Sequence, residues 1–350
     1  MIEVYSSSLK KKTYPVAKYI KRIATSSMPS LGRDEPKRSD MGVGVSRTKG
    51  KSGGLKKPSW NDRFRGARNP SDVVELLESS AEERKYFRHY TTLSAFLCIT
   101  EKPDDWMFRL TRGDNPNMND QLEWRRLGDS NTWKRTFICS FSGVEGESAA
   151  MWGLYGKPAN EALRLSFSRD AMLEWINALR GGHCKGPVVQ FFDENDNVGT
   201  KQQLEWNDVD VYFADVLYGG SVSSGEEPSD LYTFRNRSLK KNLFSHFDQK
   251  FEKTSEITGF IKSQDWAYED ETRIIIRVKE DVALPQDKQL KDIRCVFIPI
   301  PREVMTKVEY KRGPCVPDKL RSVLGDKIVQ IIGLEAFISD SKYKDNLKFK

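Results

Sequence analysis

Charge is distributed so unevenly along this 350-residue chain that its first 70 residues must be considered apart from the rest. Residues 1–70 carry 17 Lys and Arg against 5 Asp and Glu, a net charge of +12, whereas the other 280 residues carry a net charge of −5. The basic segment also holds few apolar residues, so burial cannot offset the entropy of ordering it. We expect a basic, largely disordered tail over 1–70, in which the helical spacing near 16–23 has two interpretations, a short basic amphipathic helix or a solvated tail. Residues 71–350 are expected to form one domain.

Several classes of protein are excluded by composition and pattern. No stretch approaches the ~18–20 apolar residues of a membrane span, and no apolar segment precedes a small-residue cleavage site near the N-terminus. The five cysteines are odd in number and scattered, and there are three histidines. Because no cysteine pair has the CxxC spacing, neither a zinc site nor a disulfide framework is indicated, and we predict no metal site. A reduced, cytoplasmic location fits this pattern.

The pattern after residue 70 alternates between helical and extended segments. Helices are expected from 71, from 91 or 92, over 148–155 with Gly156 closing it, over 168–179, over 229–262 and from 318. Strands are expected over 85–90, 136–141, 163–167, 187–192, 209–218, 271–278, 296–299 and 308–310. Helices come early and between strands, which predicts an α+β fold with a mixed or antiparallel sheet.

The first of three chemically suggestive segments is the run from Phe87 to Leu93. His89 lies at the end of a strand, immediately before a helix, and it shares one strand face with Thr91 while Tyr90 takes the other. Donors fixed at such a junction can bind ribose hydroxyls or phosphates. The alternative is that Tyr90 belongs to the core and His89 holds the turn.

The second segment combines small polar groups with aromatic rings. Ser140 and Ser142 point to the same side of a strand, and a short helix with Trp152 and Tyr155 follows. Aromatic rings beside hydroxyls suit a flat heterocycle such as nicotinamide or adenine. The alternative is that both aromatic residues are part of the core.

The third segment places acidic and basic residues in an apolar strand. Glu269, Glu271 and Arg273 would face one way if the chain were extended there. Paired carboxylates can serve glycosidic chemistry, in which one stabilises an oxocarbenium-like transition state and the other orients or deprotonates an acceptor. The alternative is an ion pair on an edge strand.

The order of these segments resembles a widespread bacterial and phage family catalogued as a domain of unknown function. The shared pattern is His-Tyr-Thr, Ser-Phe-Ser, Met-Trp-x-x-Tyr-Gly and Tyr-Glu-x-Glu-x-Arg, over about residues 86–280. The chain departs from it at Thr272, where the family has tryptophan. Residues after 280 form a C-terminal extension outside the resemblance.

That family in turn resembles the ADP-ribosyltransferase fold, a split β-sandwich of mixed or antiparallel sheets with flanking helices that binds NAD in a cleft. The resemblance implies that Glu271 is the catalytic glutamate, Glu269 an auxiliary one and His89 a first-strand histidine at the adenosine ribose. It further implies that NAD contacts the residues Tyr90, Thr91, Ser140, Ser142, Trp152, Tyr155 and Arg273.

The resemblance therefore implies an NAD-dependent ADP-ribosyltransferase, or an NAD-cleaving relative, acting as a toxin or antiviral defence protein in conflict between bacteria and phages. The basic tail makes nucleic acid, or a protein bound to nucleic acid, a reasonable acceptor. A neutralising partner is possible. Two alternatives stay open: a non-catalytic nucleic-acid-binding protein that uses residues 1–70, and a metal-dependent nuclease that uses Asp265, Glu269 and Glu271.

Overall fold

The computed structural model describes residues 60–102, 105–115, 123, 129–193, 197–219, 231–234, 237–240, 255–333 and 336–344. All of them belong to one compact unit that spans 57–350. The predicted tail residues 1–59, including the segment 16–23, lie outside the described residues. The last part of the predicted tail is folded, because Trp60–Gly66 form a helix whose Trp60 and Phe64 are buried.

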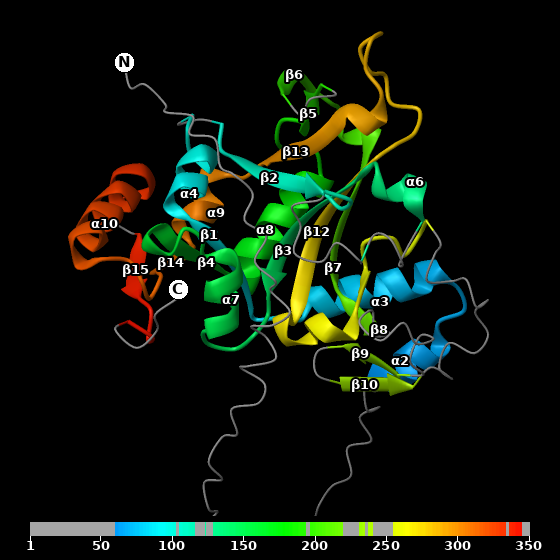
Figure 1. The fold of residues 1–350 in the computed structure, drawn as a ribbon. Helices are drawn as coiled ribbons and strands as arrows, with labels where there is room; N and C mark the ends of the chain where they lie inside the picture. The colour runs from blue at the N-terminus through cyan, green and yellow to red at the C-terminus, as the bar shows by residue number, and fades with distance from the viewer. Residues whose placement is uncertain are drawn as a thin grey trace, which may run out of the picture. The chain divides into compact units, whose positions relative to one another are not determined.

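The described helices and strands follow one another in α+β order, as expected (Figure 1). The helices are α2 (Trp60–Gly66), α3 (Pro70–Glu82), α4 (Leu93–Ile99), α6 (Ser130–Trp133), α7 (Ala149–Tyr155), α8 (Arg169–Arg180), α9 (Arg302–Thr306) and α10 (Asp318–Ile332), with the 3-10 helix η5 (Gln264–Glu269). The strands are β1 (Tyr86–Thr92), β2 (Met107–Arg112), β3 (Thr136–Ser142), β4 (Ala162–Ser168), β5 (Val188–Phe192), β6 (Val198–Gln203), β7 (Val209–Asp215), β8 (Leu217–Gly219), β9 (Leu231–Phe234), β10 (Arg237–Lys240), β11 (Ile261–Lys262), β12 (Glu271–Val278), β13 (Ile293–Pro299), β14 (Glu309–Arg312) and β15 (Phe337–Asp340).

The larger sheet forks at β3. One edge of β3 pairs along its whole length with β12, and β7 continues beyond β12, so the three strands lie side by side in Figure 1. The opposite edge is shared, because β1 pairs with the C-terminal end of β3 at Arg88–Ser142 and β2 pairs with its N-terminal half. One arm then runs β1-β4-β14-β15 and the other β2-β13-β5-β6. The sheet is mixed, since β14 and β15 are parallel and its other described pairs are antiparallel. A second sheet has the order β10-β9-β8-β11.

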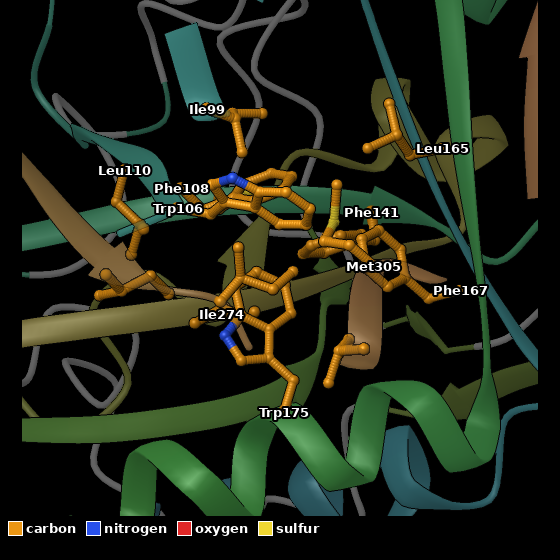
Figure 2. Close-up of a cluster of buried hydrophobic side chains, with 14 of the residues drawn as sticks. Ile99, Trp106, Phe108, Leu110, Phe141, Leu165, Phe167, Trp175, Ile274 and Met305 are labelled. Atoms are coloured by element: carbon orange, nitrogen blue, oxygen red, sulfur yellow. The ribbon is translucent and has the colours of Figure 1, made fainter. Parts of the chain in front are cut away.

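The two faces of β3 and β12 point into different environments. Phe137, Cys139 and Phe141 of β3 pack into the main core, together with Ile274 and Ile276 of β12. Trp175 of α8 projects into the same cluster (Figure 2). On the opposite face of the two strands, Ile138 of β3 and Ile275 of β12 belong to a second apolar cluster. Further along that opposite face, strand alternation places Ser140 and Ser142 of β3 and Glu271 and Arg273 of β12.

Local sequence signals fixed several element ends. Thr92, Ser148 and Ser168 are the N-caps of α4, α7 and α8, and Gly156 is the C-cap of α7. The cap of α3 is Asn69, and the helix begins at Pro70, one residue before the expected start at 71, because Pro70 takes the first turn and the Asn69 side chain accepts from the Asp72 amide.

One predicted element is wrong. The polar helix expected over 229–262 is replaced, in its described parts, by strands β9 and β10, a series of turns over 255–260 and strand β11. β9 and β10 pair with each other from Phe234–Arg237 to Leu231–Lys240, so this part of the predicted helix is an antiparallel hairpin.

Candidate functional site

The register of three neighbouring strands brings the site residues into one row. Arg88 of β1 lies opposite Ser142 of β3, and Ser142 lies opposite Glu271 of β12. Directly paired residues project to the same side of a sheet, so these three side chains share a face. The pair Ser140–Arg273 lies on that face one step along. The sheet therefore gathers residues from three strands that are distant in sequence.

A network of buried charges occupies this face at the start of β12. The ammonium Nζ of Lys262 lies 2.6 Å from Oε2 of Glu269 and 3.0 Å from Oε2 of Glu271. Arg273 donates from Nε to Oε1 of Glu271 at 2.7 Å and from Nη1 to Oε1 of Glu123 at 2.6 Å. All five side chains are buried, with residue exposures of 1–5%. Buried charges on this scale are tolerated only because each has a partner of opposite sign.

The two glutamates converge through an unusual backbone conformation between them. Glu269 ends η5 and Glu271 begins β12, and the intervening Asp270 has φ 45°, in the left-handed region. A residue with a Cβ atom adopts this conformation at a cost, although Asp tolerates it better than most. The Asp270 carboxylate receives two hydrogen bonds from Arg84, at 2.8 and 2.9 Å, which hold the turn. Glu269 was expected to lie on the same strand as Glu271, but it ends η5 instead. Both carboxylates nevertheless contact Nζ of Lys262.

Two tyrosines complete the carboxylate site. Tyr155, at the end of α7, donates from its hydroxyl to Oε1 of Glu269 at 2.6 Å. The Tyr218 hydroxyl accepts from the backbone N–H of Glu271 at 2.8 Å. Tyr155, which the resemblance implies as a contact of NAD, therefore lies directly on one of the two carboxylates, whereas Tyr218 was not foreseen.

Trp152 does not reach the carboxylates. Its ring packs edge-on against Tyr90 with centroids 4.9 Å apart, and its Nε1 donates to Glu147 at 3.2 Å. Both aromatic residues are buried, in a small cluster with Met151 and Ala162. For Tyr90 and Trp152, the structure supports the alternative in which these rings are core residues.

His89 points to the other face of the sheet from Glu271. It lies opposite Leu165 on β4, and its ring contacts Phe108 and Phe141 of the main core at centroid distances of 5.3 and 5.5 Å. Nδ1 lies 3.0 Å from the carbonyl oxygen of Ser140, and burial lowers the pKa of the imidazole. Thr91 has the same strand parity and shares this face. His89 is partly exposed, as expected, but its expected place in a pocket with Glu271 is wrong, because strand alternation turns Arg88 rather than His89 to the face of Glu271.

Burial and neighbouring charges push the two carboxylates in opposite directions. Burial alone would raise the pKa of Glu271, but Arg273 and Lys262 lower it well below its usual range, so this group is a carboxylate. The pKa of Glu269 is raised, chiefly by burial and further by the charge of Glu271, against the effect of Lys262. A pair whose pKa values are driven apart provides one permanent anion and one group able to exchange a proton.

A second group of cations lies on the same sheet face, beside the carboxylate site. Arg88 is buried, and its Nη1 donates to the carbonyl oxygen of Val144 at 2.5 Å while its Nε has no hydrogen-bond partner. Among the described residues, no carboxylate lies within 4.0 Å of the Arg88 guanidinium. Arg164 of β4 faces the same way, donates to Gly146 O at 3.2 Å and lies 3.7 Å from Glu309. Burial, with Arg164 adding to it, lowers the pKa of Arg88.

Sequence reasoning missed several of these residues. Lys262 lies seven positions before Glu269 in an apolar segment, where a lone lysine requires a partner, and that signal was available. Glu123 and Tyr218 carry no local signal, because only tertiary contacts bring them to Arg273 and Glu271. Arg88 was not selected, because the adjacent His89 was taken as the functional residue of that segment.

Asp265, the third acid of the nuclease alternative, is exposed and accepts from Ser263. Within the part of the chain that the structure describes, no group of three or more His, Cys, Asp or Glu side chains could hold a metal ion. In that same part, no helix is both long and apolar enough to cross a membrane. No family model, curated protein or solved structure matches the chain.

Proposed function

We propose that this protein cleaves the glycosidic bond of NAD and transfers ADP-ribose to an acceptor, as an ADP-ribosyltransferase or an NAD-cleaving relative. The observation that carries the proposal is the pair Glu269 and Glu271. These carboxylates share one lysine ammonium, yet their pKa values are driven apart. The forked antiparallel arrangement around β3 is compatible with the split β-sandwich that the sequence resemblance implies.

Glu271 is suited to the bond-breaking step. When the bond between ribose C1′ and the nicotinamide nitrogen breaks, its electron pair leaves with nicotinamide and positive charge develops on the ribose. A carboxylate held ionised by Arg273 and Lys262 would accept from the ribose 2′-hydroxyl and stabilise that charge without reorganising. Preorganised contacts of this kind contribute about 10²–10³-fold to a rate.

Glu269 is suited to the bond-forming step. The acceptor oxygen or nitrogen bonds to C1′ and releases a proton, and a carboxylate with a raised pKa can take it. The Tyr155 hydroxyl, bonded to the same carboxylate, would hold Glu269 in position. With water as acceptor the same steps hydrolyse NAD.

Arg88 and Arg164 would supply the charge that an anionic dinucleotide needs. Arg88 has an unused guanidinium donor and lies on the same sheet face as Glu271, one strand beyond β3. Guanidinium groups are well matched to phosphate oxygens. In this proposal Arg88 takes the place on the first strand that the sequence resemblance gave to His89.

The decisive experiment is the release of free nicotinamide from NAD by wild type, Glu271→Gln, Glu269→Gln and the control Glu174→Gln, which removes an exposed ion-pair partner of Lys307. We expect Glu271→Gln to lower turnover about 10²–10³-fold, Glu269→Gln to impair transfer more than cleavage, and the control to match wild type. Equal nicotinamide release by wild type and Glu271→Gln at equal folded fraction would refute the catalytic assignment.

The net charge of +12 on residues 1–70 favours an acceptor that is nucleic acid or is bound to nucleic acid. The same charge supports the alternative in which the tail binds nucleic acid and the folded part is not an enzyme. The two are separated by measuring nicotinamide release and oligonucleotide binding for the full chain and for a chain that begins at residue 57. Loss of nucleic-acid binding with no nicotinamide release from either chain would favour the alternative.

A further inference from the structure

One buried carboxylate outside the proposed catalytic pair accepts an unusually large set of hydrogen bonds. Glu147 is 8% exposed and lies in the loop of residues 143–148, between β3 and α7. Trp152 Nε1 donates to its Oε2 at 3.2 Å, and Lys311 Nζ lies 3.3 Å from its Oε1. These contacts fix Glu147 to α7 on one side and to β14 on the other.

The remaining donors to Glu147 come from the C-terminal strap, which we define as residues 341–344. Ser341 donates from its hydroxyl to Oε2, and the Lys342 backbone N–H donates to Oε1 at 3.0 Å. The Tyr343 hydroxyl donates to the backbone carbonyl of Glu147 at 3.2 Å. Some 195 residues separate these partners in sequence, so the strap and the loop are joined by tertiary contacts alone.

The loop that Glu147 holds also covers the arginines of the proposed site. The carbonyl oxygens of Val144 and Gly146 accept from Arg88 and Arg164, and the Gly143 N–H donates to Asp270 O at 2.7 Å. A Cβ atom at Gly143 would lie 1.5 Å from Nη1 of Arg84, so a side chain there would displace the Arg84 guanidinium. The loop is thus packed directly onto the turn that separates Glu269 from Glu271.

Helix α7 carries the effect of the loop to the catalytic pair. The loop leads into Ser148, which caps α7, and the helix ends with Tyr155 on Glu269. The Ser148 N–H also donates to the Tyr90 hydroxyl at 3.3 Å, which anchors the start of the helix. Because α7 is only seven residues long, a displacement at its first turn moves Tyr155 as well.

We propose that Glu147 is a positioning residue that couples the C-terminal strap to the Tyr155–Glu269 contact. The strap lies in the extension beyond residue 280, so this inference assigns a role to a part of the chain that the proposed function leaves unexplained. Its effect on turnover rests on the proposed function, whereas its effect on the loop does not.

The loop itself supplies a test that is independent of activity. A glutamyl endopeptidase cleaves after Glu145, which is exposed in the loop, and after Glu280, whose side chain is 75% exposed far along the chain. Compared with wild type, Glu147→Gln and Tyr343→Phe should each accelerate cleavage after Glu145 about tenfold or more, with cleavage after Glu280 unchanged. Lys342→Ala is the matched control, because it lies in the strap but keeps the backbone N–H that bonds Glu147.

Turnover gives the second readout. If nicotinamide release is established, Glu147→Gln should lower kcat about tenfold and leave KM for NAD within about twofold, as expected when only the position of Glu269 is disturbed. If the variants accelerate cleavage after Glu145 but wild type releases no nicotinamide, the contact between the strap and the loop is supported and the proposed enzymatic function is refuted. Cleavage after Glu145 at the wild-type rate in both Glu147→Gln and Tyr343→Phe would overturn the coupling, whatever the activity.

Discussion

Substituting the lysine between the two glutamates tests whether the buried charge network is organised as described. In Lys262→Met, Glu271 keeps its two hydrogen bonds from Arg273, at 2.7 and 3.1 Å. Glu269 loses its cation at 2.6 Å and keeps only the Tyr155 hydroxyl among its side-chain contacts. The carboxylate left buried without a cation is therefore that of Glu269. Removing one partner of a buried ion pair typically costs about 3–5 kcal/mol, and we expect a loss of that size.

The double variant Lys262→Met with Glu269→Gln should recover much of the lost free energy of unfolding, because it removes the unpaired charge of Glu269 and keeps the shape of that side chain. We expect a coupling energy of about 2 kcal/mol or more between the two sites. The assay is urea unfolding at pH 7 for wild type, both single variants and the double variant. The exposed pair Lys307 and Glu174, with side chains 50% and 42% exposed, provides a control cycle in which we expect at most about 0.5 kcal/mol.

The single variant has a further signature in its pH dependence. Without Lys262, the pKa of Glu269 rises further above its unfolded value, so the folded state binds a proton more tightly than the unfolded state. Lys262→Met should then become more stable as the pH falls through that raised pKa, and the double variant should not. Additive free energies within about 0.5 kcal/mol, together with a flat pH dependence, would refute the shared-ammonium arrangement.

Three other predictions follow from the site. Because the pKa of Glu271 is lowered in the folded state, its contribution to stability is present above its unfolded pKa of about 4.5 and is lost as the pH falls; Glu271→Gln should flatten the acid limb of a stability profile measured by urea unfolding. His89 lies against the core and Arg88 on the carboxylate face. We therefore expect His89→Ala to lower the melting temperature with little change in KM for NAD, and Arg88→Met to raise KM for NAD with little change in the melting temperature. A large KM effect from His89→Ala alone would contradict the assigned faces. Asp270 has a left-handed backbone, so Asp270→Ala should cost about 1–2 kcal/mol more than Asp270→Asn in thermal unfolding, and equal losses would show that φ is not the constraint.

The elements with strong local signals were predicted well. The caps at Thr92, Ser148 and Ser168 satisfy helix ends that any structure must satisfy, so they can be identified from a few neighbouring residues. The strand Glu271–Val278 is rich in β-branched residues, with Thr272, Ile274–Ile276 and Val278, and this composition favours a strand over a helix. The segment 231–240 has neither signal, and its hairpin was mistaken for part of a helix.

The candidate site was predicted in part, for a physical reason that concerns register. Alternation in the sequence shows that His89 and Tyr90 face opposite ways, but not which of them faces Glu271. That choice is made when Arg88, rather than His89, pairs with Ser142. The partner Glu123 could not be assigned either, because the contact that neutralises Arg273 forms only when segments 150 residues apart in sequence meet.

The fork at β3 has a consequence for how the chain acquires its structure. β3 must pair with β12, which follows it by about 130–140 residues, and with β1 and β2, which precede it. Pairing segments so far apart in sequence costs the entropy of closing a large loop before the new contacts stabilise the chain, and this makes folding slow. β3 joins both arms to β12, so it cannot leave the sheet without separating them. We therefore expect the amide protons of Phe137–Phe141 to exchange with solvent only through global unfolding, and those of the β5–β6 and β14–β15 pairs at the ends of the arms to exchange first.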